Sequence, residues 1–170
     1  MSTNPMRVAR IEKVVVNIGV GEGGDKLVKA EKVMGMVTGA KPSRTLSRVA
    51  NRDWQLREGA PIGVRVTLRG EQAAAFVKKA LDVRQFKVPE YSFDDGGNLN
   101  IGLADYTDFP GQKYDPEIGI FGMDIAIVIA RPGNRVKNRR LLTRKIPKEH
   151  KVSREEAMEL MRTQFNVEVI

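Results

Sequence analysis

The feature that most constrains the fold of this 170-residue sequence is a strictly alternating segment after Pro61. Apolar residues stand at every second position from Ile62 to Leu68, and between and after them come Gly63, Arg65, Thr67 and Arg69. Successive side chains of a β-strand point to opposite faces, so one face of this strand belongs to a core and the other is polar and basic. The polar face either meets solvent or suits phosphate and ribose contacts.

Other segments add helices and further strands. Strands are predicted at residues 10–20, 91–93, 99–103 and 123–131. Helices are predicted from an Asp25 cap to a Gly39 stop, at 71–83, and after a capping box of Ser153 and Glu156. This pattern indicates an α+β fold: a single-domain sandwich over residues 1–170, with an antiparallel-rich sheet, helices packed on one face and a long basic loop.

Composition excludes several classes of protein. The chain has no cysteine and one histidine, so disulfides, thiol nucleophiles and Cys-based or His-rich metal sites are not expected. No stretch approaches the ~20 apolar residues of a membrane span, and no signal peptide is evident. We expect a cytoplasmic protein with no metal, no cofactor and no membrane contact. A net charge of +8 favours a polyanionic partner.

The positive charge is concentrated in two segments. Residues 131–154 hold ten Lys and Arg against one Glu, and we expect this basic extension to be ordered only against an anionic partner. Residues 47–57 lie in an aperiodic basic stretch and predict a mobile loop. Aromatic rings are absent from 131–154, which favours recognition of folded nucleic acid over base stacking. Trp54, in the loop, is either a core or a stacking residue.

An enzymatic alternative rests on the glycine-rich segment 19–24, which spells G-x-G-x-x-G between a strand and a helix. The dinucleotide-binding reading needs a second parallel strand ending in an acid, but the following stretch is basic and aperiodic. Glu22 also places a carboxylate where a pyrophosphate would lie. A nucleotide-dependent enzyme is therefore the weaker hypothesis.

Other catalytic candidates are also weak. Asp94 with Asp95, or Asp105 with Asp108, read as turn formers beside Gly and Asn. His150 stands among cations that oppose its protonation, which favours a phosphate or solvent contact over acid–base work. We expect no enzymatic activity.

Several motifs, in order along the chain, together resemble one family. They are 10–22, 39–42, 61–70, 93–98, 109–110, 114–115 and 119–125. The chain resembles large-subunit ribosomal protein five, the family that holds 5S rRNA in the central protuberance. Residues 131–135 and 153–158 look like its archaeal and eukaryotic branch, and we expect an archaeal source.

The resemblance implies three groups of RNA-contacting residues. The 5S rRNA group is Lys13, Asn17, Lys41, Pro42, Thr45, Arg65, Thr67 and Arg69. The loop that reaches peptidyl-site tRNA carries Arg48, Asn51, Arg52, Trp54 and Arg57. Other large-subunit rRNA contacts are Arg131, Arg135, Lys137, Arg139, Arg140, Arg144 and Lys145. Ala40 departs from the family, which commonly has Gln there.

The resemblance also implies a bridge to a protein of the small-subunit head, and the acidic 105–117 region is a candidate contact for a basic protein. A third hypothesis, a nucleic-acid or translation accessory factor outside the ribosome, shares the same charge pattern.

Overall fold

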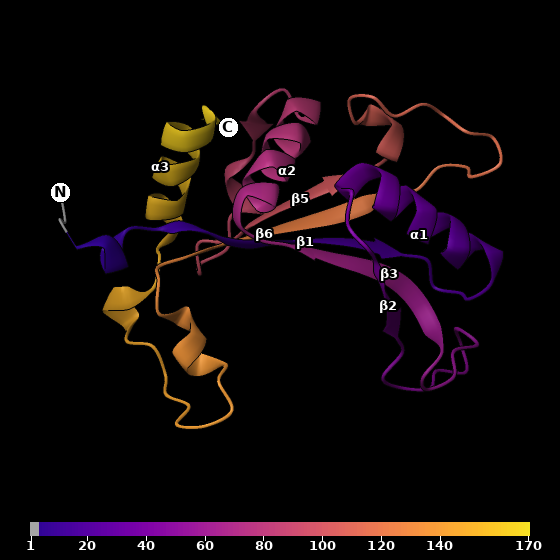
Figure 1. Ribbon diagram of the computed structural model, residues 1–170, viewed down its shortest axis with the longest axis horizontal. Helices are drawn as coiled ribbons and strands as arrows, with labels where there is room; N and C mark the ends of the chain where they lie inside the picture. Colours follow the sequence, from indigo (N-terminus) through magenta and orange to yellow (C-terminus); the bar gives the residue numbers. More distant parts are fainter. Residues whose placement is uncertain (1–3) are drawn as a thin grey trace. The chain divides into compact units, whose positions relative to one another are not determined.

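The computed structural model describes residues 4–170 (Figure 1). Its main sheet has the strand order β2-β3-β1-β6-β5, and a second, two-stranded sheet pairs β4 with β7. The strands are β1 (Arg10–Gly19), β2 (Ser43–Leu46), β3 (Pro61–Leu68), β4 (Lys87–Val88), β5 (Leu99–Leu103), β6 (Met123–Ala130) and β7 (Glu168–Val169). The α-helices are α1 (Asp25–Thr38), α2 (Gly70–Val83) and α3 (Arg154–Phe165). The predicted α+β class, with a five-stranded antiparallel sheet, is confirmed.

The described residues group into two compact units. The hairpin unit comprises Val15–Leu68 and Ile101–Ile125, and the C-terminal unit comprises the residues up to Val14, Arg69–Asn100 and Ala126–Ile170. Strands β1, β5 and β6 each contribute residues to both units.

In the hairpin unit, α1 packs on β3 (Figure 1). The helix buries the stripe Leu27, Ala30, Val33, Met34 and Val37, and β3 buries Val64, Val66 and Leu68. The expected Asp25 cap is wrong by one residue: Gly24 is the N-cap, at φ 95°, and Asp25 opens the helix. Gly39 ends α1 as predicted, in the left-handed conformation at φ 67°.

In the C-terminal unit, α2 and α3 supply half of the buried hydrophobic residues. Buried positions of α2 are Ala73, Phe76, Val77, Ala80 and Leu81, and those of α3 are Ala157, Met161 and Phe165. The predicted capping box is confirmed, since Ser153 Oγ accepts from Glu156 N and the Glu156 carboxylate accepts from Ser153 N.

One predicted strand is wrong. Glu90–Ser92 form a 3₁₀ helix instead of the strand expected at 91–93, and Phe93 N donates to Glu90 O to close it. Phe93 contributes only an isolated bridge to Leu99. Pro89, just before the turn, cannot donate to a ladder, which favours a break in pairing at this point.

Candidate nucleic-acid interface

The polar face predicted from the 62–69 alternation exists in the hairpin unit. Arg65 and Thr67 are exposed on β3, between the buried Val64, Val66 and Leu68. The antiparallel register places Ser43 opposite Arg65 and Thr45 opposite Gly63, so β2 adds two hydroxyls to the same face. Ser43 Oγ donates to Arg65 O at 3.1 Å. Ser43 could not be predicted from the sequence, because a four-residue strand with one apolar residue has no visible period.

Gly63 allows β2 to lie close to β3 at the centre of this face. A Cβ added at Gly63 would lie 2.8 Å from Thr45 Oγ1 and 2.9 Å from the Ile18 carbonyl oxygen. No side chain fits there without a shift of the strands. The close packing at this polar face therefore depends on the glycine.

Arg44 holds the edge strand β2 against the helix. It stands opposite the buried Val64, on the other face from Ser43 and Thr45, and its guanidinium forms a bidentate pair with Glu31 of α1. Nη2 donates to Glu31 Oε2 at 3.1 Å. The hydrogen bond from Arg44 lowers the pKa of the Glu31 carboxyl below its usual value. This basic residue is thus engaged inside the chain, which the sequence does not reveal.

The turn that follows α1 presents Lys41 and Pro42. Thr38 Oγ1 donates to Met34 O at 2.6 Å and accepts from Ala40 N at 3.3 Å, and β2 begins at Ser43. Lys41 is exposed and Pro42 is half-buried. Because only the backbone of Ala40 takes part, the turn closes without the glutamine side chain common in the family.

The remaining residues predicted to contact 5S rRNA differ in exposure, and they belong to different compact units. Asn17, on the open side of β1, is half-buried in the hairpin unit. Lys13 and Arg69 belong to the C-terminal unit, where Lys13 is half-buried and Arg69 is exposed as the N-cap of α2.

The segment predicted as a mobile basic loop is closed by backbone pairing. Ser47 N donates to Ala60 O and Gly59 N donates to Ser47 O at its base, and Asn51 pairs with Leu56 near its tip. The Asn51 side chain accepts from the backbone N–H groups of Asp53 and Trp54. This hairpin could not be predicted from the sequence, because turn hydrogen bonds to an Asn side chain leave no apolar period. The Asn51 side chain therefore stabilises the turn, whereas the sequence predicted only a contact with tRNA for it.

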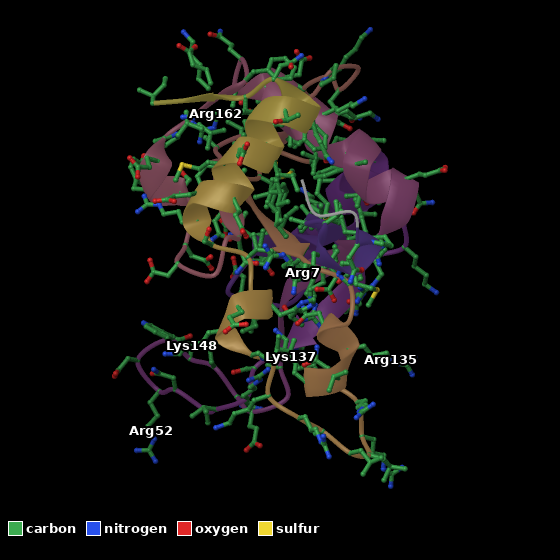
Figure 2. The ribbon with its side chains drawn as sticks, turned by 90° about the vertical axis from the view of Figure 1, so that its left-hand side faces the viewer. Arg7, Arg52, Arg135, Lys137, Lys148 and Arg162 are labelled. Carbon is green, nitrogen blue, oxygen red and sulfur yellow. The ribbon has the colours of Figure 1, made fainter. Side chains whose placement is uncertain are left out.

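The tip of this hairpin carries the predicted tRNA-contacting side chains. Trp54 is 73% exposed, so the core alternative for this residue is wrong. Arg48, Arg52 and Arg57 are all exposed. Figure 2 shows Arg52 projecting away from the ribbon of the loop. A ring and three cations on a closed hairpin can contact a nucleic-acid backbone and an unstacked base.

The basic extension, residues 131–154 of the C-terminal unit, is anchored by its own first residue. Arg131 donates from Nε to Arg7 O at 2.9 Å and from Nη1 to Glu149 O at 2.8 Å and Lys151 O at 3.2 Å. Its Nη2 pairs with Glu156 of α3 at 2.7 Å, and only 15% of its side chain is exposed. Arg131, predicted as an rRNA contact, thus uses most of its donors within the chain. We expected the extension to be ordered only against an anion, but these hydrogen bonds of Arg131 hold it within the chain.

Other cations of the extension face outward. Arg139 donates to Leu142 O at 2.9 and 2.6 Å and so shapes a turn at the tip. The other predicted contacts are exposed and make no side-chain hydrogen bond within residues 4–170: Arg135, Lys137, Arg140, Arg144 and Lys145.

His150, expected to meet phosphate or solvent, instead lies half-buried with Nε2 at 2.8 Å from Pro132 O.

The geometry speaks against the glycine-rich segment as a phosphate site. Val20 N and Gly21 N both donate to Ile62 O, and Glu22 pairs with Lys26. The strand after α1 is the edge strand β2, which β3 separates from β1 and which ends at Leu46, so the glycines are not followed by an adjacent paired strand that ends in an acid. The weaker hypothesis, the nucleotide-dependent enzyme, lacks its structural basis.

Acidic side chains considered for catalysis serve as turn formers. Asp94 accepts from Asn98 N and Nδ2, both at 2.7 Å, and Asp105 Oδ1 accepts from Thr107 N. Within residues 4–170, no three Asp, Glu or His side chains gather as a metal site. None of the helices in the described part of the chain has the length and apolar character that crossing a membrane requires.

Comparison with known proteins places this arrangement in a family. Residues 4–57 match the family model described as "Ribosomal protein L5", and residues 61–162 match the one described as "ribosomal L5P family C-terminus". The chain belongs to the ribosomal protein L5 family. Its similarity to L5-family proteins of archaea, named "Large ribosomal subunit protein uL5", extends over nearly the whole length.

Three of these uL5 relatives illustrate the similarity. The protein of Thermoplasma volcanium is 50% identical over 168 residues, which cover 98% of this chain and 99% of the relative. That of Sulfurisphaera tokodaii is 49% identical over 170 residues, covering 99% and 96%. That of Methanoregula boonei is 44% identical over 164 residues, covering 96% and 99%. As a uL5-family member, the chain is a structural protein of the large ribosomal subunit and not an enzyme.

Proposed function

We propose that the open face of β2 and β3, together with the 39–42 turn, binds 5S rRNA in the central protuberance of the large subunit. The observation that carries the proposal is the row of Ser43, Arg65, Thr67 and Thr45, which offers two threonine hydroxyls, the Ser43 oxygen as an acceptor and a guanidinium, without any acidic side chain. Hydroxyls suit ribose 2′-OH groups and a guanidinium suits phosphate. The half-buried amide of Asn17 and the exposed Lys41 extend the same recognition.

Two further contacts complete the proposed role. The 47–57 hairpin reaches peptidyl-site tRNA through Arg48, Arg52, Arg57 and the exposed ring of Trp54. The exposed cations of the extension contact large-subunit rRNA. The acidic 105–117 segment, in which Asp108 and Glu117 are exposed, supports a contact with a basic protein, in a bridge to the small-subunit head.

The test compares Arg65→Ala with wild type in binding 5S rRNA over a salt series. Loss of one phosphate contact is expected to weaken binding and to reduce the slope of log K against log salt by about one. Thr67→Ala, which removes hydrogen bonds but no charge, is expected to weaken binding by about 1 kcal/mol and to leave the slope unchanged.

A matched control is Arg162→Ala, which removes an equal charge from an exposed position on α3 (Figure 2). It is expected to leave both affinity and slope nearly as in wild type. Equal effects of Arg65→Ala and Arg162→Ala would show that charge alone, and not this face, governs binding. Equal affinity of the wild-type chain for an unrelated RNA of the same length would contradict specific recognition.

A further inference from the structure

A cavity of about 530 Å³ lies within the C-terminal unit, between β6 and the basic extension. Aliphatic side chains of β6 and of the extension line one part of it, and lysines of the extension line another. Its volume falls within the roughly 300–1,000 Å³ of small-ligand sites. Of the rRNA contacts proposed above, Lys137 and Lys145 lie at this cavity.

The floor of the cavity is apolar. β6 buries Ile127 and Ile129, so Val128 and Ala130 point to the opposite side and are only half-buried. Ile146, also half-buried, adds a third aliphatic side chain from the extension. An apolar floor on the open side of a strand is the kind of surface on which a flat apolar ring can lie.

The rim of the cavity is basic. Lys137, Lys145, Lys148 and Lys151 all line it, and none of these ammonium groups has an ion pair or hydrogen bond within residues 4–170. Figure 2 shows Lys137 and Lys148 on the two short helices η4 (Asn134–Lys137) and η5 (Lys148–His150), with Arg135 on the far side of η4. Glu149, in the same segment, is not among the lining residues.

The walls are fixed by hydrogen bonds within the chain. Arg131 joins the start of the extension to the backbone of Glu149 and Lys151, and His150 contacts Pro132 O at 2.8 Å. Asn134 Nδ2 donates to Glu12 at 2.7 Å, and Asn98 is held by Asp94. The cavity is therefore formed without a ligand, and a ligand would not have to pay for its ordering.

We propose that this cavity, here named the β6 slot, accepts one unstacked nucleotide of a single-stranded rRNA segment. The base lies on Val128, Ala130 and Ile146, and the lysines of the rim hold its phosphate and those of its neighbours. This inference rests on the proposed contact between the extension and large-subunit rRNA, and it specifies that contact as an extruded base. The unopposed positive rim favours a polyanion carrying a flat ring over an acidic peptide, which would bring no ring for the floor.

The test is a titration of the full chain followed by NMR of the Val, Ile and Ala methyl groups and the backbone amides. The probes are adenosine and uridine 5′-monophosphate, ribose 5-phosphate, inorganic phosphate, a single-stranded pentanucleotide, its duplex form and a hexaglutamate peptide. We expect the monophosphates to shift the methyl signals of Val128, Ala130 and Ile146. The single-stranded pentanucleotide is expected to do so at lower concentration, because more phosphates meet the rim. The duplex, the sugar phosphate and inorganic phosphate are expected to leave these methyl groups unshifted.

Two pairs of variants make the test specific. Ala130→Leu fills the floor and is expected to raise the Kd for the pentanucleotide at least about tenfold, whereas Ala126→Leu, on the same side of β6 but outside the slot, leaves it unchanged. Lys137→Ala is expected to raise the Kd about threefold, the effect of one exposed charge contact, and Arg135→Ala of the same helix to raise it less. Melting temperatures of all four variants show that each is folded.

Several results would overturn the proposal. Equal methyl shifts from inorganic phosphate would leave an anion site with no base recognition. Equal shifts from the peptide or the duplex would assign the slot to a protein or to paired RNA. A response to monophosphates but not to the pentanucleotide would make it a free-nucleotide site. Binding of 5S rRNA, measured in parallel, separates the β6 slot from the proposed 5S rRNA face. Ala130→Leu is expected to bind 5S rRNA as the wild type does. If the wild type itself did not bind 5S rRNA, only the proposed function would be contradicted.

Discussion

At the scale of single residues, Gly63 shows how a missing side chain shapes a binding surface. It lies between Thr45 and the backbone of Ile18, where the Cβ of any other residue would be under 3.0 Å from both neighbours. Core packing tolerates such an overlap only by moving a strand. The glycine therefore permits the close approach of Thr45 and of the Ile18 carbonyl to β3.

Replacing this glycine gives a direct prediction. Gly63→Ala is expected to lower the free energy of unfolding by about 1–3 kcal/mol, because the backbone carbonyl of Ile18 on β1 and the Thr45 side chain must both give way. It is also expected to weaken 5S rRNA binding, measured at a temperature where the variant is fully folded. Urea unfolding supplies the first quantity and filter binding the second.

The control for this prediction is Gly19→Ala. A Cβ at Gly19, at the end of β1, meets nothing within 4 Å and its φ is not positive, so the change is expected to be nearly neutral. If Gly63→Ala behaved like Gly19→Ala in both measurements, the close approach of β2 would have no role in the face.

At the scale of elements, the basic extension depends on one arginine that charge counting assigns to RNA. Arg131 contacts the backbone of the N-terminal segment, the η5 helix and the carboxylate of Glu156. A planar guanidinium with five donors can join three segments in this way, whereas a lysine ammonium cannot match the same geometry. The extension is therefore an organised element of the fold, with its outward cations held in place.

A pair of substitutions tests this role. Arg131→Met is expected to lower the free energy of unfolding by about 2–4 kcal/mol, because Glu156 and several carbonyl groups lose their partner. Arg131→Lys keeps the charge and is expected to recover less than half of the loss. Faster amide hydrogen exchange at His150 and Lys151, whose N–H groups close η5, is the local measurement. Unchanged exchange in Arg131→Met would show that the extension does not depend on this residue.

The sequence predicts the long elements well because a period needs length. Strand β3 and helices α1 and α2 carry clean alternating or helical patterns, and the cap of α3 is written in two residues, Ser153 and Glu156. Strands β2, β4 and β7 have four residues or fewer, so their existence follows from their partners and not from their own pattern. For the same reason the polar residue Ser43 was missed.

Of the candidate site, the exposed polar face of β3 could be predicted, but the hydrogen bonds of its residues could not. Exposed Arg65 and Thr67 follow from the alternation itself. Arg131 and Asn51, by contrast, are polar residues whose donors or acceptors the fold uses for itself, and no local pattern distinguishes such a residue from one that awaits RNA. Trp54 is another case: its exposure follows from the hairpin that carries it, which only the hydrogen bonds of residues 47–60 reveal.

At the scale of the whole molecule, the net charge of +8 combines segments of opposite sign. Residues 94–124 hold seven acids and one lysine, whereas residues 131–154 hold ten cations and one acid. In a family of large-subunit ribosomal proteins, such a distribution suits a chain that contacts RNA and protein with different surfaces. The central claim is that the β2–β3 face is the one that reads 5S rRNA.

The measurement that tests this claim most directly is cross-linking of the full chain to 5S rRNA by ultraviolet light, with the cross-linked peptides mapped by mass spectrometry. The account predicts cross-links in residues 39–46 and 61–69, and their loss when the complex is dissociated by high salt before irradiation. Cross-links confined to residues 131–154, with none on the β2–β3 face, would contradict it.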